Sequence, residues 1–600
     1  MSIRRFTPLA LIALIALTPM TARLRAADDS TPAVAHIKLT GDLDEAPVAA
    51  DSLLGGSSEN FKSKLDRIKK AAKDDNVKAL YLEIDDLGVG WGKMDELARA
   101  IAEFRKTGKK VFAYIEGGEA KDYLLATSCD EICEPESGWL MLIGVRAEVG
   151  FYKNLLDKIG VKADMLRMGD AKSAVEPYIQ DHMSDASRKQ LEGVLNDYYE
   201  NSMVGRVVQN RPAKHFTAEQ VKKIIDAGPY TANAAKEKGL IDRVAYKQDF
   251  EDSFKKTLKL DKADIARNYG SAKSDELDLS SPFAIFKLLA PSKGTESSDK
   301  PKIAVIYATG VITSGKSSGG SLFGEATCGS TTMIEAIKQA EDDDTVKAIV
   351  LRVDSPGGSA LASDLMWSEL TRCKKPVIAS MSDTAASGGY YICMGAKKIY
   401  AEPGTLTGSI GVFGGKMALG GTYEKLGINT EVITRGANAN IFSTTFPFSE
   451  SEKEAMTALI HETYDQFLNK AIAGRNGAGV KMTRKDLEPI AGGRIWTGRQ
   501  AKGLGLVDEL GDLNDAVAAS KKAAGLPEDK EMELLILPKP RSFLDALLDA
   551  KSDALVPRMA MQELLREAPE LAPKLRAVEG LLRMRGEPVW LMDPCRIEVR

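Results

Sequence analysis

Apolar and polar positions follow two alternating patterns along most of this 600-residue chain. Short β-branched apolar runs such as "KVFAYIE" and "KPVIASM" have the length and composition of buried strands. Between such runs lie amphipathic stretches of helical period, for example "KMDELARAIAEFRKTG" and "LASDLMWSELTRC". Strands that alternate with helices favour an α/β fold built on a largely parallel sheet.

The same pattern occurs twice. "VAHIKLTGDL" from Val34 matches "IAVIYATGVI" from Ile303. Near the end of each pattern, "YTANAAKEKGLID" from Tyr230 matches "WTGRQAKGLGLVD" from Trp496. The two matches have almost the same separation along the chain, which indicates two copies of one domain rather than an array of small repeats.

Changes in composition divide the chain further. We expect a first copy over residues 28–269 and a second over 302–540. Residues 270–301, rich in Ser, Lys, Asp and Pro, indicate a linker that holds one short helix. Residues 541–600 are rich in Leu, Ala and Arg, have no counterpart in the first copy and predict a helical tail.

The N-terminus has the form of an export signal. Arg4 and Arg5 precede an apolar run from Pro8 to Leu17, and small residues follow it. The run is shorter than the roughly 20 residues of a spanning helix. Residues 1–27 are therefore a cleaved signal or a short anchor. We expect the body of the protein outside the cytoplasm, in solution or against the membrane surface.

Overall charge excludes one class of function. The net charge of −4 supplies no basic field for nucleic acid. The six cysteines match neither a disulfide framework nor a paired metal-binding motif. We expect no cofactor, no metal and no nucleic-acid partner.

The two copies differ at positions that carry chemistry. When the copies are aligned, Ser387 of "ASGGYY" lies opposite Ala120, so the second copy alone has a hydroxyl there. The loop "DSPGG", residues 354–358, lies opposite "DDLGV", residues 85–89. Two adjacent glycines let backbone N–H groups turn toward a ligand, as an oxyanion hole requires.

Downstream the asymmetry is reversed. Lys172 of "GDAKSAVEPY" lies opposite Ala439, so the first copy alone has this amine. One copy thus has a candidate nucleophile without the lysine, and the other has the lysine without the nucleophile. We expect one composite site assembled across the two copies.

A lysine is a chemically reasonable base for this serine. A hydroxyl is a weak nucleophile until a base accepts its proton, and burial of a lysine favours the neutral amine that can do so. Lys397 and Lys398 are nearer in sequence, but on one helix they would lie about 15 Å from Ser387. No histidine is close to Ser387 in sequence; the four are His36, His182, His215 and His461.

Simpler interpretations exist for each motif. A serine at a helix start is commonly an N-cap, and Lys172 by itself would be an ordinary surface lysine. "GVITSGKS", residues 310–317, fits the phosphate-loop pattern, but a flexible stretch follows it where a phosphate loop would continue into a helix.

Taken together, these motifs resemble the signal peptide peptidase A family, also called protease IV, in its long two-copy form. The likeness rests on "DSPGG", "ASGGYY", "TLTGSIGVFG" and "GDAKSAVEPYIQDHMS" and spans most of the chain. It implies tandem domains like those of the caseinolytic protease and crotonase enzymes. By this resemblance Ser387 is the nucleophile, Lys172 is the general base and acid, and Ser409 orients the lysine. Gly357 and Gly358 supply or shape the oxyanion hole.

The resemblance also implies a function. Family members form a membrane-associated tetrameric dome that degrades cleaved signal peptides. We therefore expect a serine endopeptidase on the extracytoplasmic side of the cytoplasmic membrane, with spent signal peptides and other hydrophobic peptides as substrates. The alternative is a non-catalytic scaffold on the same fold that binds peptides or organises membrane proteins. Acyl-CoA chemistry on a crotonase-like fold agrees poorly with an export signal and a serine–lysine pair.

Overall fold

The computed structural model defines most of both copies. Residues 1–27, which we expect to form an export signal or a short anchor, lie outside the described residues, as do most of the linker and most of the tail. The described residues are 33–46, 59–260, 264–271, 299–318, 326–527, 532–539 and 589–592.

The first copy is built on a parallel sheet in the order β10-β1-β2-β3-β5-β9. Helices α1 (Phe61–Lys73) and α2 (Trp91–Lys106) pack on one face, and α10 (Lys247–Thr257) packs on the other. The strands are β1 (Ala33–Asp42), β2 (Val77–Gly88), β3 (Lys110–Ile115), β5 (Glu131–Glu134), β9 (Arg243–Val244) and β10 (Asp264–Ala266).

The second copy repeats this order as β22-β11-β14-β16-β17-β21, and β16 also pairs with β18. Helices α12 (Ser330–Asp342) and α13 (Ala360–Arg372) pack on one face, and α19 (Leu513–Ala523) on the other. The α/β class and the duplication are confirmed. The strands are β11 (Lys302–Thr309), β14 (Val346–Ser355), β16 (Val377–Ala386), β17 (Lys398–Ala401), β18 (Leu406–Gly408), β20 (Ile495–Thr497), β21 (Glu509–Leu510) and β22 (Glu533–Leu537).

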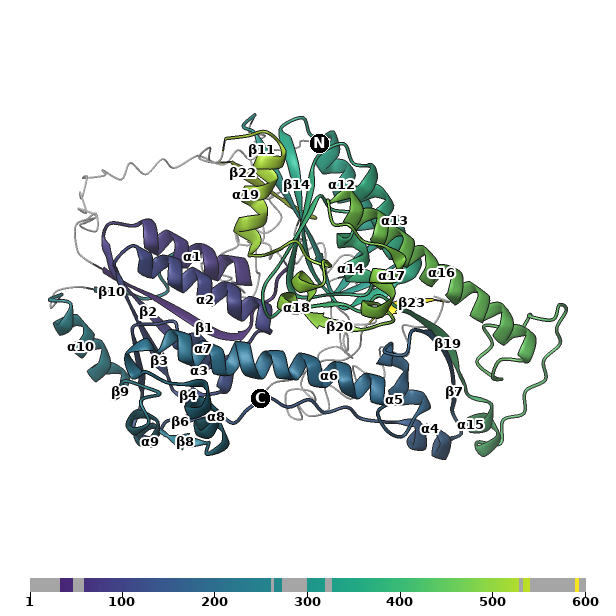
Figure 1. Ribbon diagram of the computed structural model, residues 1–600, viewed down its shortest axis with the longest axis horizontal. Helices are drawn as coiled ribbons and strands as arrows, with labels where there is room; N and C mark the ends of the chain where they lie inside the picture. The colour runs from purple at the N-terminus through teal and green to yellow at the C-terminus, as the bar shows by residue number, and fades with distance from the viewer. Residues whose placement is uncertain are drawn as a thin grey trace, which may run out of the picture.

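A third sheet joins the copies. Strand β7 (Lys162–Met168) of the first copy pairs antiparallel with β19 (Val412–Ala418) of the second, from Val412 opposite Met168 to Ala418 opposite Lys162. Figure 1 shows α6 (Asp185–Asp197) running from the first copy beneath the second, toward the end of the molecule where β7 and β19 lie. This arm of the first copy places residues 162–197 against the second copy.

Buried charges also lie between the copies. Arg352 is fully buried and forms ion pairs with Glu45 at 2.8 Å and Glu96 at 2.6 Å. Burial raises the pKa of Glu96 to about 7, although Arg352 opposes the shift. Because breaking a buried ion pair leaves an uncompensated charge, this cluster holds the copies in one relative position.

A second ion-pair cluster lies next to it. Lys93 Nζ contacts Asp354 at 2.9 Å and Asp383 at 3.4 Å. Burial alone would lower the pKa of Lys93, but the two carboxylates raise it. Asp354 opens the "DSPGG" loop and Asp383 lies on β16, so this lysine of the first copy holds two segments that lead to Ser387.

Three sequence-based expectations concern the tail, the linker and the loop at residues 310–317. A helical tail was expected over 541–600, but the described residues there include β23 (Trp590–Met592), a strand that pairs with two others. This pairing stabilises the extended conformation of these three residues, although the composition of residues 541–600 favours helix. The short helix expected in the linker lies outside the described residues. "GVITSGKS" contains strand β12 (Val311–Thr313) and runs into bends through residue 316 rather than a helix.

Candidate active site

Ser387 lies at the turn between β16 and the short helix α14 (Gly388–Cys393). Its backbone has φ 54° and ψ −112°, a region that non-glycine residues seldom adopt. Strain of this kind persists only where the surroundings impose it, and it concentrates at functional sites. The hydroxyl makes no capping bond to the helix, so the N-cap interpretation does not account for this serine.

Lys172 brings its amine to this hydroxyl from the other copy. It follows β7 and is 1% exposed. Its Nζ donates to Ser387 Oγ at 2.8 Å, to Ser409 Oγ at 2.9 Å and to the Ser409 carbonyl oxygen at 3.2 Å. The three side chains singled out in the sequence therefore converge on one buried point, although Lys172 and Ser387 are 215 residues apart.

Ser409 follows β18 and is also held in a left-handed backbone conformation, at φ 52°. Its N–H donates to the Arg494 carbonyl at 2.6 Å, and the Ser387 N–H donates to the Gly408 carbonyl at 2.8 Å. These two bonds join the serine turns to each other and to the strand β20 region. They fix both hydroxyls around the amine.

A double glycine that the sequence analysis did not single out positions Lys172. A Cβ on Gly493 would lie 2.5 Å from both the nitrogen and the Cα of Lys172, so only glycine fits. The Ala171 N–H donates to the Gly492 carbonyl at 3.1 Å. The backbone of the second copy thus lies directly against the loop that carries Lys172. The double glycine in "AGGRIWTG", just before the segment from Trp496 that matches Tyr230 onward in the first copy, was the available signal.

Gln190 on α6 forms hydrogen bonds to both sides of the contact between the lysine loop and the second copy. Its Nε2 donates to the Ala171 carbonyl and to Ser173 Oγ, both at 3.0 Å. Its Oε1 accepts the Ile495 N–H of β20 at 3.2 Å. One buried amide therefore bonds the residues on both sides of Lys172 and the second copy at the same time. Nothing in its local sequence pattern indicated this role.

The "DSPGG" loop packs against the start of α14. A Cβ on Gly388 would lie 3.1 Å from the Gly358 nitrogen and 3.2 Å from Gly357 Cα. Ser355 shapes the loop, because its Oγ accepts the Gly357 N–H at 3.1 Å and donates to the Gly310 carbonyl at 2.7 Å. The Gly357 N–H is thus engaged within the loop, and the Gly358 nitrogen lies beside the residue that follows the serine.

The equivalent place in the first copy is filled differently. Ala120 begins the helix α3 (Ala120–Ala126), and the buried Asp122 carboxylate accepts the N–H groups of Asp86 at 3.2 Å and Leu87 at 3.0 Å. Burial raises the pKa of Asp122 to about 6. The counterpart of Lys172, Ala439, is exposed in a loop of the second copy.

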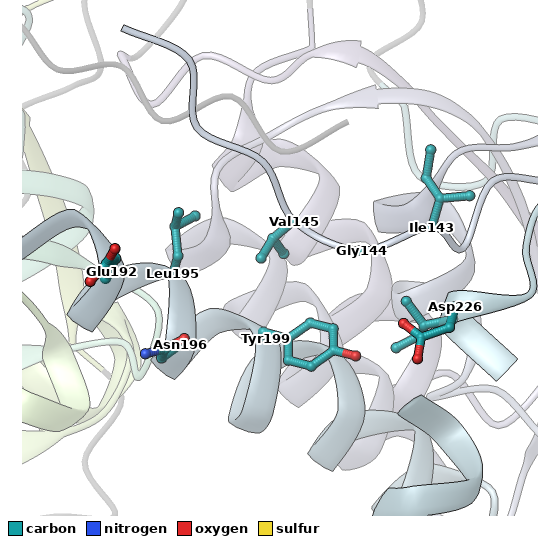
Figure 2. A pocket seen from close by; sticks show the side chains of 9 residues that line it. Ile143, Gly144, Val145, Glu192, Leu195, Asn196, Tyr199 and Asp226 are labelled. Carbon is teal, nitrogen blue, oxygen red and sulfur yellow. The ribbon is translucent and has the colours of Figure 1, made fainter. Parts of the chain in front are cut away.

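A separate cavity of about 340 Å³ lies in the first copy, and Figure 2 shows its lining. It opens between the loop at Ile143–Gly144 and side chains from α6 and the following π-helical turn η2 (Tyr198–Val204). Ile143–Gly144 is the repeat counterpart of Ile410–Gly411 beside Ser409. The lining includes neither Ser387 nor Lys172.

A strained serine at a strand-to-helix turn, hydrogen-bonded to a buried amine, is the arrangement of a serine hydrolase. Comparison with known proteins gives the particular family. The model of Peptidase family S49 matches residues 103–261 and 369–527, one segment in each copy. The chain belongs to this family and is a serine protease.

Sequence relatives support this assignment. The chain is 34% identical to "Serine protease SPPA, chloroplastic" of Arabidopsis thaliana over 83% of this chain and 70% of that protein. It is 33% identical to "Protease 4" of Salmonella typhi over 83% of this chain and 78% of that protein. Among solved structures, a mutant of the membrane-bound stomatin-specific protease 1510-N matches 40% of this chain and 98% of its own, with 17% identity and a TM-score of 0.25.

Proposed function

We propose that this protein is a serine endopeptidase in which Ser387 is the nucleophile and Lys172 the general base, with hydrophobic peptides, chiefly spent signal peptides, as substrates. The observation that carries the proposal is the 2.8 Å contact between Lys172 Nζ and Ser387 Oγ, made across the two copies. Residues 28–269 and 302–540 are proposed as the two domains that supply the base and the nucleophile.

Acylation follows from this contact. The neutral Lys172 amine accepts the hydroxyl proton while Ser387 Oγ attacks the carbonyl carbon of the scissile bond. Burial of the lysine favours the neutral amine, since desolvation penalises the ammonium form. Ser409 accepts from the same nitrogen and keeps it directed at Ser387. The ammonium then returns the proton to the departing amine, and an ester forms on Ser387.

The oxyanion needs donors on the other side of the carbonyl. The Gly388 N–H is in the first turn of α14, where N–H groups have no intrahelical acceptor. The Gly358 nitrogen lies beside Gly388. We assign the oxyanion hole to these two groups, with Gly357 shaping the loop through its bond to Ser355. Removal of one such donor costs about 10²–10³ in kcat in other serine proteases.

Deacylation reverses the roles. Lys172 accepts a proton from a water molecule, whose oxygen attacks the ester carbonyl, and the ammonium then protonates Ser387 Oγ as the carboxylate product leaves. One lysine thus serves as base and acid in both halves of the cycle. No cofactor enters any step.

Location and assembly are part of the proposal. We propose an exported protein on the extracytoplasmic face of the cytoplasmic membrane, assembled as a homotetramer. Among the residues that the structure describes, no helix is long and apolar enough to cross a membrane. Exposed apolar side chains beyond β19, including Ile433 and Phe442, offer a contact surface for another copy. N-terminal sequencing of membrane and soluble fractions tests the fate of residues 1–27, and light scattering tests the tetramer.

A fluorophosphonate probe tests the chemistry directly. The purified protein should be labelled at Ser387, and Lys172→Ala should prevent both labelling and peptide hydrolysis while leaving the circular dichroism spectrum unchanged. Lys397→Ala is the matched control and should label at the normal rate. Full activity in the Lys172→Ala protein would contradict the role of this lysine, and labelling at another serine would contradict that of Ser387.

A further inference from the structure

Strand β16 bulges shortly before it reaches Ser387. Its register with β14 shifts opposite Asp354 and leaves residues 382–384 of β16 outside the regular ladder between these two strands. Ser387 follows the bulge three residues later. A β-bulge bends its strand and re-aims the side chains that follow, and bulges are common beside active sites. The contacts that hold this bulge therefore influence where the serine lies.

Helix α2 of the first copy holds the bulge at Asp383. The N-cap residue of α2 is Gly90, which has no side chain to cap the helix. The N–H groups of Gly90 and Lys93 instead donate to the Asp383 carboxylate, at 3.0 Å and 2.7 Å. These are the two N–H groups that a capping box satisfies within one helix. Here a carboxylate from the other copy supplies both acceptors.

Two glycines of "GVGWGK" admit this contact. A Cβ on Gly90 would lie 2.3 Å from Asp383 Cγ, and a Cβ on Gly92 would lie 2.6 Å from the Ser382 carbonyl oxygen. Gly90 has φ −76°, which suits any residue, so the approach of Asp383 and not the backbone excludes a side chain there. The start of α2 is thus shaped to receive the bulge.

The corresponding helix of the second copy is capped differently. Helix α13 begins after Ser359, whose own Oγ accepts the Ala362 N–H at 3.2 Å. The cap of α13 is therefore internal to its copy, whereas the cap of α2 is formed between the copies. The difference gives Asp383 a partner on the first copy that an ordinary strand residue would not need.

Lys93 connects the bulge to the glycine loop. Its Nζ lies 3.4 Å from Asp383 and 2.9 Å from Asp354. Asp354 also accepts the Thr384 N–H at 3.1 Å, within the bulge. Because Asp354 opens the loop that contains Gly358, groups on α2 contact both the strand of the proposed nucleophile and the loop of the proposed oxyanion hole.

We propose that Asp383 is a positioning residue for the reaction at Ser387. By capping α2 and pairing with Lys93, it fixes the bulge and with it the distance from the serine to the glycine loop. The first copy then contributes to catalysis twice, through the amine of Lys172 and through the start of α2. This inference rests on the proposed function and adds to it a residue that acts through Ser387.

The first test is Asp383→Ala in the full chain. A misplacement of about 1 Å can cost about 10²-fold in rate, so kcat for a chromogenic peptide and the rate constant for fluorophosphonate labelling should both fall about 10²-fold. KM should change less than about threefold, since the substituted group does not touch substrate. The labelled fraction at the end of the reaction should stay complete. A merely structural role would instead lower that fraction and leave the rate constant unchanged, which would overturn the proposal.

Two further variants separate capping from general stability. Asp383→Asn keeps an oxygen acceptor, and because Asn caps helices as well as Asp, kcat should stay within about fivefold of the unsubstituted value. Thr217→Ala is the control, because it removes the side-chain cap of another first-copy helix, α8 (Ala218–Asp226), far from Ser387 in sequence. It should leave the labelling rate constant unchanged. An Asp383→Asn protein as slow as Asp383→Ala, or an equal loss in Thr217→Ala, would refute the capping role.

Gly90→Ala tests the same contact from the first copy, with Asp383 still present. Its Cβ would displace the carboxylate and should lower the labelling rate constant about tenfold. Gly477→Ala, at the end of α16 (Glu450–Gly477), adds a Cβ that meets nothing within 4 Å and should change nothing. The Gly90→Ala, Asp383→Ala double variant should be no slower than Asp383→Ala, because both changes remove one contact. Additive losses, or an unchanged Gly90→Ala protein, would overturn the proposal, even if Asp383→Ala fails to fold.

The outcomes separate this inference from the proposed function. If the unsubstituted protein is labelled at Ser387 and every variant keeps its rate constant, the serine assignment stands and the role of Asp383 is refuted. If the unsubstituted protein is neither labelled nor active, the proposed function fails and this inference fails with it.

Discussion

The two copies share a sheet and its strand order but differ at one turn. In the second copy the strand-to-helix turn holds Ser387 at φ 54°, and the equivalent first-copy helix begins at Ala120 after Glu119 at φ −59°. The first-copy loop is held by the Asp122 carboxylate, whereas "DSPGG" uses its own Ser355 hydroxyl. A duplicated fold can therefore keep its architecture in both copies while only one keeps the strained turn.

The lysine segment shows the opposite difference. In the first copy Lys172 is buried against Gly493 of the second copy, whereas its counterpart Ala439 lies in an exposed loop. Each copy has thus kept the part that the other lacks. Activity should depend on the serine turn, on the lysine segment and on the contacts that bring them together.

The largest effect should come from the proposed catalytic pair, Ser387 and Lys172. Ser387→Ala and Lys172→Ala should each lower kcat/KM by at least about 10³-fold, and the double variant should be no worse than either single one, because the two groups act as a unit. Ala120→Ser in the Ser387→Ala background should restore nothing, since the first-copy turn lacks the strained geometry. Steady-state hydrolysis of a chromogenic peptide measures all four proteins, and additive losses would refute the shared site.

Next in size is the ion pair that joins the copies. Lys93→Met should lower the free energy of unfolding by about 3–5 kcal/mol, because it removes the cation from the partly buried carboxylates of Asp354 and Asp383. Lys106→Met breaks an exposed pair with Glu103 and should change stability by less than about 0.5 kcal/mol. Urea denaturation compares them, and equal losses would show that the contact between the copies does not depend on Lys93.

A comparison of Gly493 with Gly479 tests the contact that positions Lys172. Gly493→Ala should lower kcat about 10²-fold, because its Cβ would displace Lys172 from Ser387. Gly479 has a similar φ, 90° against 84°, but its added Cβ would meet nothing within 4 Å. Gly479→Ala therefore has the same backbone strain without the clash and should keep its activity. If both variants lose activity equally, strain rather than the position of Lys172 is responsible.

The smallest effect concerns the inactive turn. Burial raises the pKa of Asp122 to about 6, above about 3.9 in an unfolded chain. The folded state therefore binds this proton more tightly, and the stability that it contributes is complete below about pH 4 and is lost as pH rises through about 6. Asp122→Asn should gain stability relative to the unsubstituted protein between pH 4 and pH 7, on the order of 1–3 kcal/mol.

Thermal unfolding across this pH range measures the difference. Asp75→Asn, at an exposed position, is the control and should follow the unsubstituted protein. A constant offset between the Asp122→Asn and unsubstituted curves would show that Asp122 titrates normally. Peptidase activity should stay unchanged in the Asp122→Asn protein, since the first-copy turn takes no part in the proposed reaction.

Much of the fold and of the candidate site could be predicted because the duplication supplies an internal alignment. Ser387 differs visibly from Ala120, and Lys172 from Ala439, so each copy marks what the other lacks. The alternating strand and helix patterns indicated the α/β class, because a buried strand can be recognised in the local sequence as a short run of β-branched apolar residues.

Other features depend on contacts that no local pattern records. Gly493 matters because a backbone from a distant part of the chain lies against it, and Gln190 because it bonds two loops at once. Lys93 on α2 has the pattern of a solvated helix residue until the second copy covers it. Strand β23 could not be predicted, because the sequence around it is Leu-rich and favours helix. Its pairing partners β15 (Gly357–Ser359) and β19 lie far earlier in the chain.

The contact between Gly493 and Lys172 also determines when, in the course of synthesis, the enzyme can begin to work. Lys172 emerges from the ribosome first, Ser387 emerges 215 residues later, and the glycine that seats the lysine comes after both. At about 5–20 residues per second, roughly 10–40 s separate the synthesis of the proposed base from that of the proposed nucleophile. An emerging chain therefore has no complete catalytic pair, and a protease made in this order is silent toward the peptides it meets while it is still being synthesised.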